Sequence, residues 1–202
     1  LYFGTTSEGG RYGGGTVYAI NPFHSNSLTV LNNFNGTNGF YPNALAYYPG
    51  TDPLKRGDVY GSTLLGGNYN HGTLFKLKGG IDFEIIHHFN KSDGSRPTSL
   101  AVGPFNRIYG TTGLGGFTGN GEIFFIDPTR GDQVTVLFDS KDIQHFYYPV
   151  GLATTHLDGN QLRGITLYGG ASNNGTLFRI NNLGDLVTEY TFGESEHGTN
   201  PF

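Results

Sequence analysis

Four copies of one phrase constrain the fold of this chain more than any single residue does. Each copy contains a strand built around a Tyr-Gly pair, then a glycine-rich loop, then a strand close to Gly-Thr-Leu-Phe-x-Ile. The phrase begins at Tyr2, Tyr60, Tyr109 and Tyr168, and the strand after the loop occupies residues 15–20, 72–77, 121–126 and 175–180. A short repeated unit cannot bury its apolar side alone, so tandem copies are expected to stack on one another.

Two further strands complete each copy. A proline opens a short apolar strand at Pro42, Pro97 and Pro149, and a strand ending in Phe occupies residues 28–34, 83–89, 133–138 and 186–192. Four short strands in a period of about 50 residues, with turn residues between them, are typical of a β-propeller blade. The sequence therefore predicts an all-β propeller of four blades, each with four antiparallel strands.

The order of the strands places the first residue of the chain inside a blade. Leu1 leads directly into a Tyr-Gly strand, so the first blade is predicted to lack its own innermost strand. We expect a single propeller or propeller segment over residues 1–202, with repeat units near 1–41, 42–96, 97–148 and 149–200. Residues 201–202 would begin the next strand. The start without Met predicts a piece processed or excised from a longer protein.

Composition excludes several classes of function. Charged residues make up 14% of the chain and the net charge is −4, so neither nucleic-acid binding nor a polybasic membrane contact is expected. No apolar run approaches the roughly 20 residues that a membrane-spanning helix needs. Cys is absent, which excludes a thiolate nucleophile, disulfides and zinc–cysteine sites. We expect neither a cofactor nor a bound metal.

Aromatic residues are concentrated in two sets of loops that a propeller brings to one face. These loops follow the Tyr-Gly strand and the Phe-ending strand. The candidate ligand-binding residues are Tyr12, Tyr69, Phe117, Tyr41, Tyr147 and Tyr148. Rings beside Asn and Asp suit the C–H faces and hydroxyls of sugars, and tyrosine anchors also suit a protein interface. A third interpretation is a plain turn whose ring folds back over the edge of the blade.

The repeated phrases resemble the GloVer-type tandem repeat of bacterial secreted and surface proteins. Its consensus runs approximately Leu-Tyr-Gly-Thr-Thr, a Gly-Gly loop, Gly-Thr-Val-Phe-Lys-Leu, a strand ending in Ser-Phe, then Pro and Gly-Leu. The resemblance covers nearly the whole chain. Departures are Phe3, Glu122 and Gly170 where Thr is usual, and an insertion at residues 49–57. The resemblance implies a propeller-like fold and an exported, modular parent protein, and it carries over no catalytic residues.

The leading functional hypothesis is a non-catalytic binding or scaffold module, extracellular or at the cell surface, that contacts glycan or protein through its aromatic loops. Repetition without an asymmetric polar cluster favours it. One alternative is a structural subunit of an extracellular filament or array, joined by strand complementation of the incomplete blade. Another is a lyase or glycosidase that uses His145 with Asp142 or Glu194. A fainter similarity to propellers of the streptogramin-lyase type lacks any recognisable catalytic set.

Overall fold

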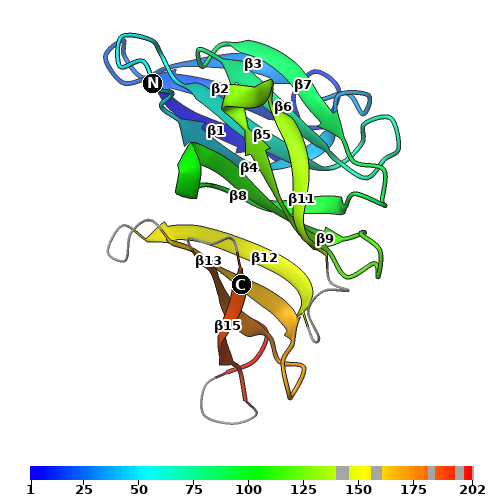
Figure 1. Cartoon of the computed structure of the whole chain (residues 1–202). Helices are drawn as coiled ribbons and strands as arrows, with labels where there is room; N and C mark the ends of the chain where they lie inside the picture. Colours follow the sequence, from blue (N-terminus) through cyan, green and yellow to red (C-terminus); the bar gives the residue numbers. More distant parts are fainter. Residues whose placement is uncertain (140–145, 156–160, 182–184, 194–197, 202) are drawn as a thin grey trace. The chain divides into compact units, whose positions relative to one another are not determined.

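The computed structural model describes the whole chain except residues 140–145, 156–160, 182–184, 194–197 and 202 (Figure 1). Within the described part the regular secondary structure is almost entirely strand, and helix is limited to the 3-10 turns Pro104–Asn106 and Pro128–Arg130. The strands form four antiparallel sheets. The predicted all-β class is therefore confirmed, and the radial arrangement of the sheets stays a prediction.

Each sheet is built from strands that follow one another along the chain. Sheet one contains β1 (Tyr2–Thr6), β2 (Thr16–Asn21) and β3 (Ser27–Asn33). Sheet two contains β4 (Phe40–Tyr48), β5 (Asp58–Leu65), β6 (Thr73–Lys78) and β7 (Asp82–His88). Sheet three contains β8 (Ser95–Gly103), β9 (Arg107–Leu114), β10 (Glu122–Asp127) and β11 (Gln133–Asp139). Sheet four contains β12 (Phe146–Thr155), β13 (Gln161–Gly169), β14 (Thr176–Ile180) and β15 (Leu186–Thr191).

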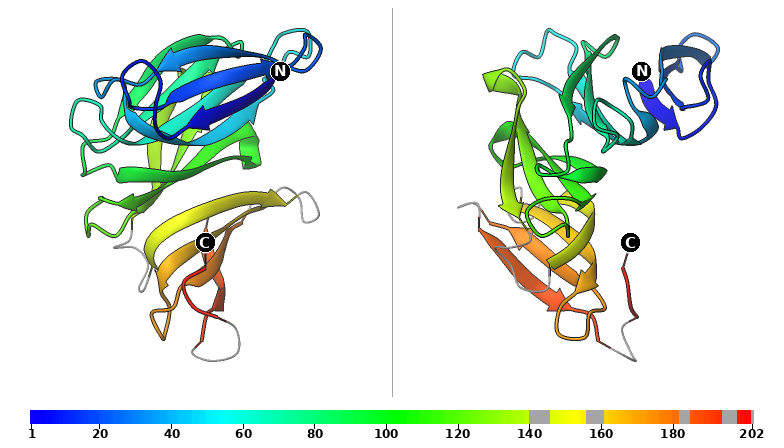
Figure 2. Two further views of the ribbon diagram at one scale, coloured as in Figure 1. Left: turned by 180° about the vertical axis from the view of Figure 1, so that it is seen from behind. Right: turned by 90° about the vertical axis from the view of Figure 1, so that its right-hand side faces the viewer.

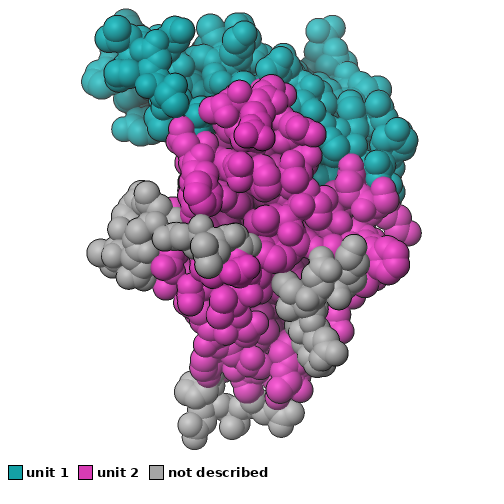
Figure 3. Space-filling model, viewed as in Figure 1, with its two compact units in different colours: residues 1–90 teal, residues 91–202 magenta. Residues whose placement is uncertain are grey.

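The sheets are distributed over two compact units, Leu1–Asn90 and Lys91–Phe202 (Figure 3). Unit one holds sheets one and two, and unit two holds sheets three and four. Figure 2 shows the sheets of each unit from two further sides. Each unit has a hydrophobic core of its own, formed where the faces of its two sheets meet.

The core of unit one joins apolar side chains from both of its sheets. Val17 from β2 and Phe34, just after β3, are buried with Val59, Phe75 and Leu77 of sheet two. The rings of Phe34 and Phe75 lie 5.3 Å apart, a distance typical of aromatic contacts. Complete burial of one such side chain contributes about 1.5–3 kcal/mol, so this cluster accounts for much of the stability of the unit.

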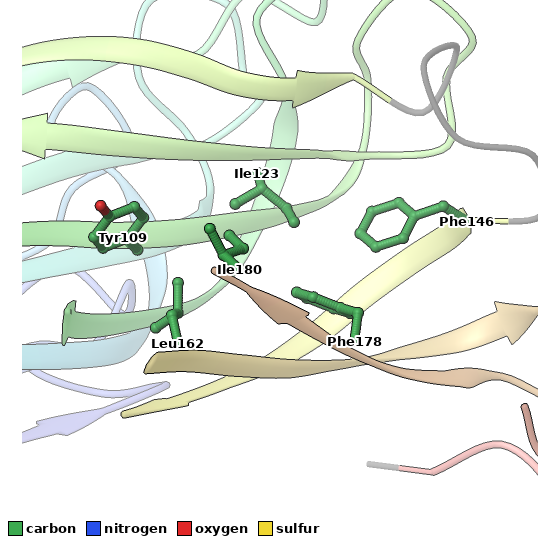
Figure 4. Packing of buried hydrophobic residues seen from close by; sticks show 6 residues of the cluster. All are labelled: Tyr109, Ile123, Phe146, Leu162, Phe178 and Ile180. Carbon is green, nitrogen blue, oxygen red and sulfur yellow. The ribbon is translucent and has the colours of Figure 1, made fainter. Parts of the chain in front are cut away.

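The core of unit two repeats the same arrangement with different residues (Figure 4). Tyr109 and Ile123 come from sheet three, and they meet Leu162, Phe178 and Ile180 of sheet four. Phe146 at the start of β12 closes one side of this cluster, and its ring lies 5.2 Å from that of Phe178.

A glycine in the second strand of every repeat lies beneath an aromatic ring of the third strand. The directly opposed pairs are Gly4 with Tyr18, Gly61 with Phe75, Gly110 with Phe124 and Gly164 with Phe178. A Cβ atom on Gly61 would lie 2.1 Å from Cζ of Phe75, and one on Gly110 would lie 2.2 Å from Cζ of Phe124. Glycine is therefore required at this position, because the ring needs the space above the backbone.

The position of this glycine corrects the predicted phrase of the fourth repeat. We expected Tyr168-Gly169-Gly170 to form the second strand there. Instead Gly164 faces Phe178, as Gly61 faces Phe75 in sheet two. Tyr168 and Gly169 end β13, and Gly170 follows that strand. The sequence was misleading because Gly164, the glycine that faces the ring, follows Arg163, whereas the equivalent Gly61 follows a tyrosine.

The glycine–ring contact can be tested with Gly110→Ala. The three atoms nearest to the added methyl group all belong to the Phe124 ring, so the ring must move, and overpacking of this kind costs roughly 1–3 kcal/mol. Gly193→Ala is the matched control in the same unit, because a Cβ there meets nothing within 4 Å. We expect urea unfolding to show the loss for Gly110→Ala and a change below about 0.5 kcal/mol for Gly193→Ala. Equal stabilities would contradict the assigned role of the glycine.

Candidate functional site

The loops between the second and third strands share one backbone conformation in all four repeats. We call them the tip loops, and they occupy residues 9–15, 66–72, 115–121 and 169–175. In each loop the N–H of the last glycine donates to the carbonyl of the first, at 3.0 Å for Gly15 and Gly9 and 3.1 Å in the other three. The paired glycines at the start of the first loop, Gly9 and Gly10, have φ values of +80° and +74°, which L side chains rarely adopt.

A pair of threonine hydroxyls closes the base of most tip loops. Oγ1 of Thr63 lies 2.9 Å from Oγ1 of Thr73 and accepts the Thr73 N–H at 3.1 Å. The same bonds join Thr6 to Thr16 and Thr166 to Thr176. The loop shape is therefore set by the sheet and by backbone hydrogen bonds, and it does not depend on the residues at the tip.

The predicted aromatic residues of these loops are exposed. Tyr12 and Tyr69 occupy the same tip position and are 52% and 59% exposed, and Phe117, one position earlier in its loop, is 80% exposed. Rings with this exposure do not cover the edge of a sheet. The fourth loop has Ala171 and Ser172 at these places, so the aromatic character is confined to the first three repeats.

A polar side chain at the end of the fourth strand holds each of the first three loops. Arg11 N–H donates to Oδ1 of Asn33 at 2.8 Å, and Phe117 N–H donates to Oδ2 of Asp139 at 3.0 Å. In sheet two the acceptor is Nδ1 of His88, which receives the Asn68 N–H at 3.3 Å. In the first two loops the bonded residue directly precedes the exposed tyrosine, and in the third loop it is Phe117 itself.

His88 is a titratable member of this set. Burial, and then the charge of neighbouring His87, hold the pKa of His88 below its ordinary value of 6.5. The neutral ring is the form that can accept the Asn68 N–H through Nδ1, so the fold favours the neutral state.

Tyr41 and Tyr148 are placed differently from the tip aromatics. Both precede a proline and have a φ of +56°, a strained value for a large residue. Tyr41 N–H donates to the Gly14 carbonyl at 3.1 Å, and Tyr148 N–H donates to the Asn120 carbonyl at 2.9 Å. Each bond ties the first strand of one sheet to the tip loop of the preceding sheet in the same unit.

The prolines that follow these residues complete the connection. Pro42 lies against Gly15 and Pro149 lies against Gly121, where a Cβ would approach the proline Cδ to 2.7 and 2.8 Å. We call the Xaa-Pro pair and the loop glycine the proline clamp. Asn200-Pro201 meets Asn174-Gly175 in the same way, with the Asn200 N–H 2.9 Å from the Asn174 carbonyl.

The structure brings the predicted residues together in two groups, one in each unit. In unit one, Tyr41 is bonded to the loop of Tyr12, and Gly67 in the loop of Tyr69 donates to the Gly36 carbonyl at 2.8 Å. In unit two, Tyr148 is bonded to the loop of Phe117. The Tyr148 ring packs over Gly113, and Tyr147 is half-buried opposite Tyr168.

Sequence reasoning missed a pair of carboxylates below the third tip loop. Glu122 is 2% exposed and lies directly opposite Asp139, which is 8% exposed. The same positions hold Thr16 and Asn33 in sheet one. Glu122 in place of Thr was the signal in the sequence. The observed role of Asp139 is to hold the loop, and the described residues contain no group of three His, Asp or Glu side chains that could bind a metal ion.

The residues expected for a lyase or glycosidase, His145, Asp142 and Glu194, lie outside the described residues. That activity stays a prediction. In the part of the chain that the structure describes, none of the helical segments has the length and apolar character needed to cross a bilayer.

Comparison with known proteins gives one positive result. The sequence model of a family described as the Gloeobacter/Verrucomicrobia repeat matches residues 1–202. This match confirms the resemblance to a GloVer-type repeat that the phrases predicted. None of the curated proteins matches the chain.

The link between His88 and its tip loop predicts a pH-dependent stability. Because the folded pKa is lowered, the stabilisation is complete above pH 6.5 and is lost as the pH falls through the folded pKa. His88→Asn copies Asn33 of sheet one and keeps an acceptor for the Asn68 N–H. In calorimetric scans across this range, we expect the melting temperature of the wild type to fall more steeply than that of the variant. Parallel pH profiles would refute the link.

Proposed function

Since the chain belongs to the Gloeobacter/Verrucomicrobia repeat family, we propose that it is a non-catalytic binding or scaffold module of a secreted or cell-surface bacterial protein. The observation that carries the proposal is the pair of exposed tyrosines, Tyr12 and Tyr69, at the same tip of two preformed loops. The proposed partner is a glycan or a protein surface.

A preformed loop reduces the entropy that binding costs. The backbone of both loops is held by hydrogen bonds that the loop N–H groups donate to the strand-end residues Asn33 and His88, so only the side-chain rotations of the tyrosines remain to be ordered. Arg11 lies over the Tyr12 ring at 5.4 Å and restricts it further. Rigid aromatic anchors of this kind supply contact area at low entropic cost.

The equivalence of the two tyrosines favours a partner that itself repeats. Consecutive repeats of unit one present the same ring on the same backbone, with Asn68 next to Tyr69. A polysaccharide offers similar units in sequence, each with a C–H face for a ring and hydroxyls for amides. Two weak contacts on one chain then combine into a stronger one.

The proposal predicts loss of binding when the tip rings are removed. A glycan array first identifies a ligand for the wild type, and titration calorimetry then compares it with the triple variant Tyr12→Ala, Tyr69→Ala and Phe117→Ala. We expect at least a tenfold weaker affinity, because each stacked ring contributes about 1 kcal/mol or more. Phe23→Ala removes an exposed ring from the turn between β2 and β3 and should leave affinity unchanged. Unaltered binding by the triple variant would reject the tip loops as the site.

A second candidate function is assembly by strand complementation. Sheet one has three strands where the other sheets have four, and β1 pairs with β2 alone among the described strands. Pro201 lies against Gly175 as Pro42 lies against Gly15 at the start of the proline-led strand β4. A strand of that type from a second copy would extend sheet one and give head-to-tail assembly.

Electron microscopy and sedimentation test this second candidate. Head-to-tail addition gives a closed ring if the rotation between neighbouring copies permits closure, and an open filament if it does not. We therefore expect rings or filaments whose amount increases with protein concentration. Single particles at every concentration would rule it out, and that result would leave the glycan proposal standing.

A further inference from the structure

The two tyrosine-bearing tip loops of unit one differ in the residue that precedes the ring. Arg11 precedes Tyr12 in the first loop, whereas the uncharged Asn68 precedes Tyr69 in the second. Both loops have the same pattern of backbone hydrogen bonds, so the two residues occupy equivalent places. The first ring therefore has a guanidinium group beside it where the second has an amide.

The sheet below the first loop fixes the backbone from which the Arg11 side chain extends. The Arg11 N–H donates to Oδ1 of Asn33 at 2.8 Å. The loop also rests directly on the sheet, because a Cβ on Gly10 would lie 2.6 Å from Cγ2 of Thr16 and 2.8 Å from Oδ1 of Asn33. Only the side-chain torsions of Arg11 remain to be ordered when a ligand binds.

The guanidinium of Arg11 is associated with the tyrosine ring and with no acidic group of the chain. Its Cζ lies 5.4 Å from the centre of the Tyr12 ring, within the range of a cation–π contact. The Arg11 side chain forms no ion pair among the residues that the structure describes, and Glu8, near the start of the same loop, is not bonded to it. Its planar set of N–H donors matches the two oxygens of a carboxylate.

Contact with a neighbouring repeat does not cover the ring at the tip of a loop. In the second loop, the Gly67 N–H donates to the Gly36 carbonyl at 2.8 Å, and a Cβ on Gly66 would lie 2.8 Å from Cα of Gly39. The connection between β3 and β4 therefore lies directly against this loop, and Tyr69 is still 59% exposed. The tip position is open to a ligand even where another repeat lies against the base of the loop.

We propose that the first tip loop binds an acidic sugar residue and that Arg11 selects its carboxylate. The inference rests on the proposed function, because it names the class of glycan that the same loops bind. The C–H face of a uronic acid packs on the Tyr12 ring, and its carboxylate receives paired N–H bonds from the guanidinium. The net charge of −4 does not attract an anion, so the selection depends on this local cation.

Trigalacturonate and its methyl ester are the matched probes, because the ester keeps the sugar rings and removes the charge. We expect calorimetry on the wild type to show about tenfold tighter binding of the acid, and a smaller difference at high salt, which screens an exposed ion pair. Arg11→Asn copies Asn68 of the second loop and should lower the affinity for the acid to that for the ester. Arg11→Lys should keep only part of the preference, since an ammonium ion lacks the paired donors.

The second loop provides a test by transfer of the charge. Adding Asn68→Arg to the Arg11→Asn variant should restore the preference for the acid, because the bond to His88 involves only the main-chain N–H of residue 68. Arg56→Gln removes a cation from the connection between β4 and β5, at the other end of the strands, and should change neither affinity. Tyr12→Ala should weaken both probes, with thermal melts confirming that each variant is folded.

The outcomes separate this inference from the proposed function on which it rests. Equal affinity of the wild type for acid and ester, or an Arg11→Asn variant that keeps the preference for the acid, would overturn the inference and leave a glycan-binding module standing. Undetectable binding of trigalacturonate at millimolar concentration, together with binding of a neutral array glycan, would have the same meaning. A wild type that binds no array glycan and neither probe would reject the inference and the glycan proposal together.

Discussion

The packing of every sheet depends on an aromatic ring of the third strand that lies across a glycine of the second. The ring has room because glycine carries no Cβ, and in sheet four this places Phe178 over Gly164. The same ring forms part of the face that meets Ile123 of sheet three. The glycine–ring face of sheet two carries Phe75 and that of sheet four carries Phe178. Each of these faces meets the opposite face of the preceding sheet, which presents Val17 in sheet one and Ile123 in sheet three, and the two faces together make the core of a unit.

The tip loops show how this scaffold separates shape from recognition. Backbone bonds between the loop glycines, and the threonine pair at the base, are repeated while the tip residues change from Tyr12 to Tyr69 and then to Thr118 and Ser172. The residue at the tip can therefore vary to suit a binding partner without changing the shape of the loop. The proline clamp adds the second constraint, because it fixes the tip loop of one sheet against the first strand of the next sheet in the unit.

Features that recur in every repeat could be predicted from the sequence. Features that depend on which residues face one another across paired strands could not. The spaced glycine and apolar positions were enough to predict four sheets. They placed the tip rings in loops but did not decide between exposed rings and rings folded back over the sheet edge, and the structure shows them exposed. The loop anchors escaped notice because Asn33, His88 and Asp139 share a position and no residue type. A bulge in each fourth strand shifts the pairing, and it cannot be located from alternation alone.

Sheet four differs from the others on the face that points away from the core of unit two. Arg163 and Arg179 stand where sheet three has Tyr109 and Phe125, and Glu189 stands in the bulge where sheet three has Leu137. Glu189 joins both arginines, with Nε distances of 2.9 Å to Arg163 and 3.0 Å to Arg179. Taking three charges out of water costs more than the pairing returns unless the new neighbour adds hydrogen bonds. This face of sheet four is therefore suited to water or to a polar partner. An apolar sheet face, like the one that sheet four itself presents to the core of unit two, would pack poorly on it.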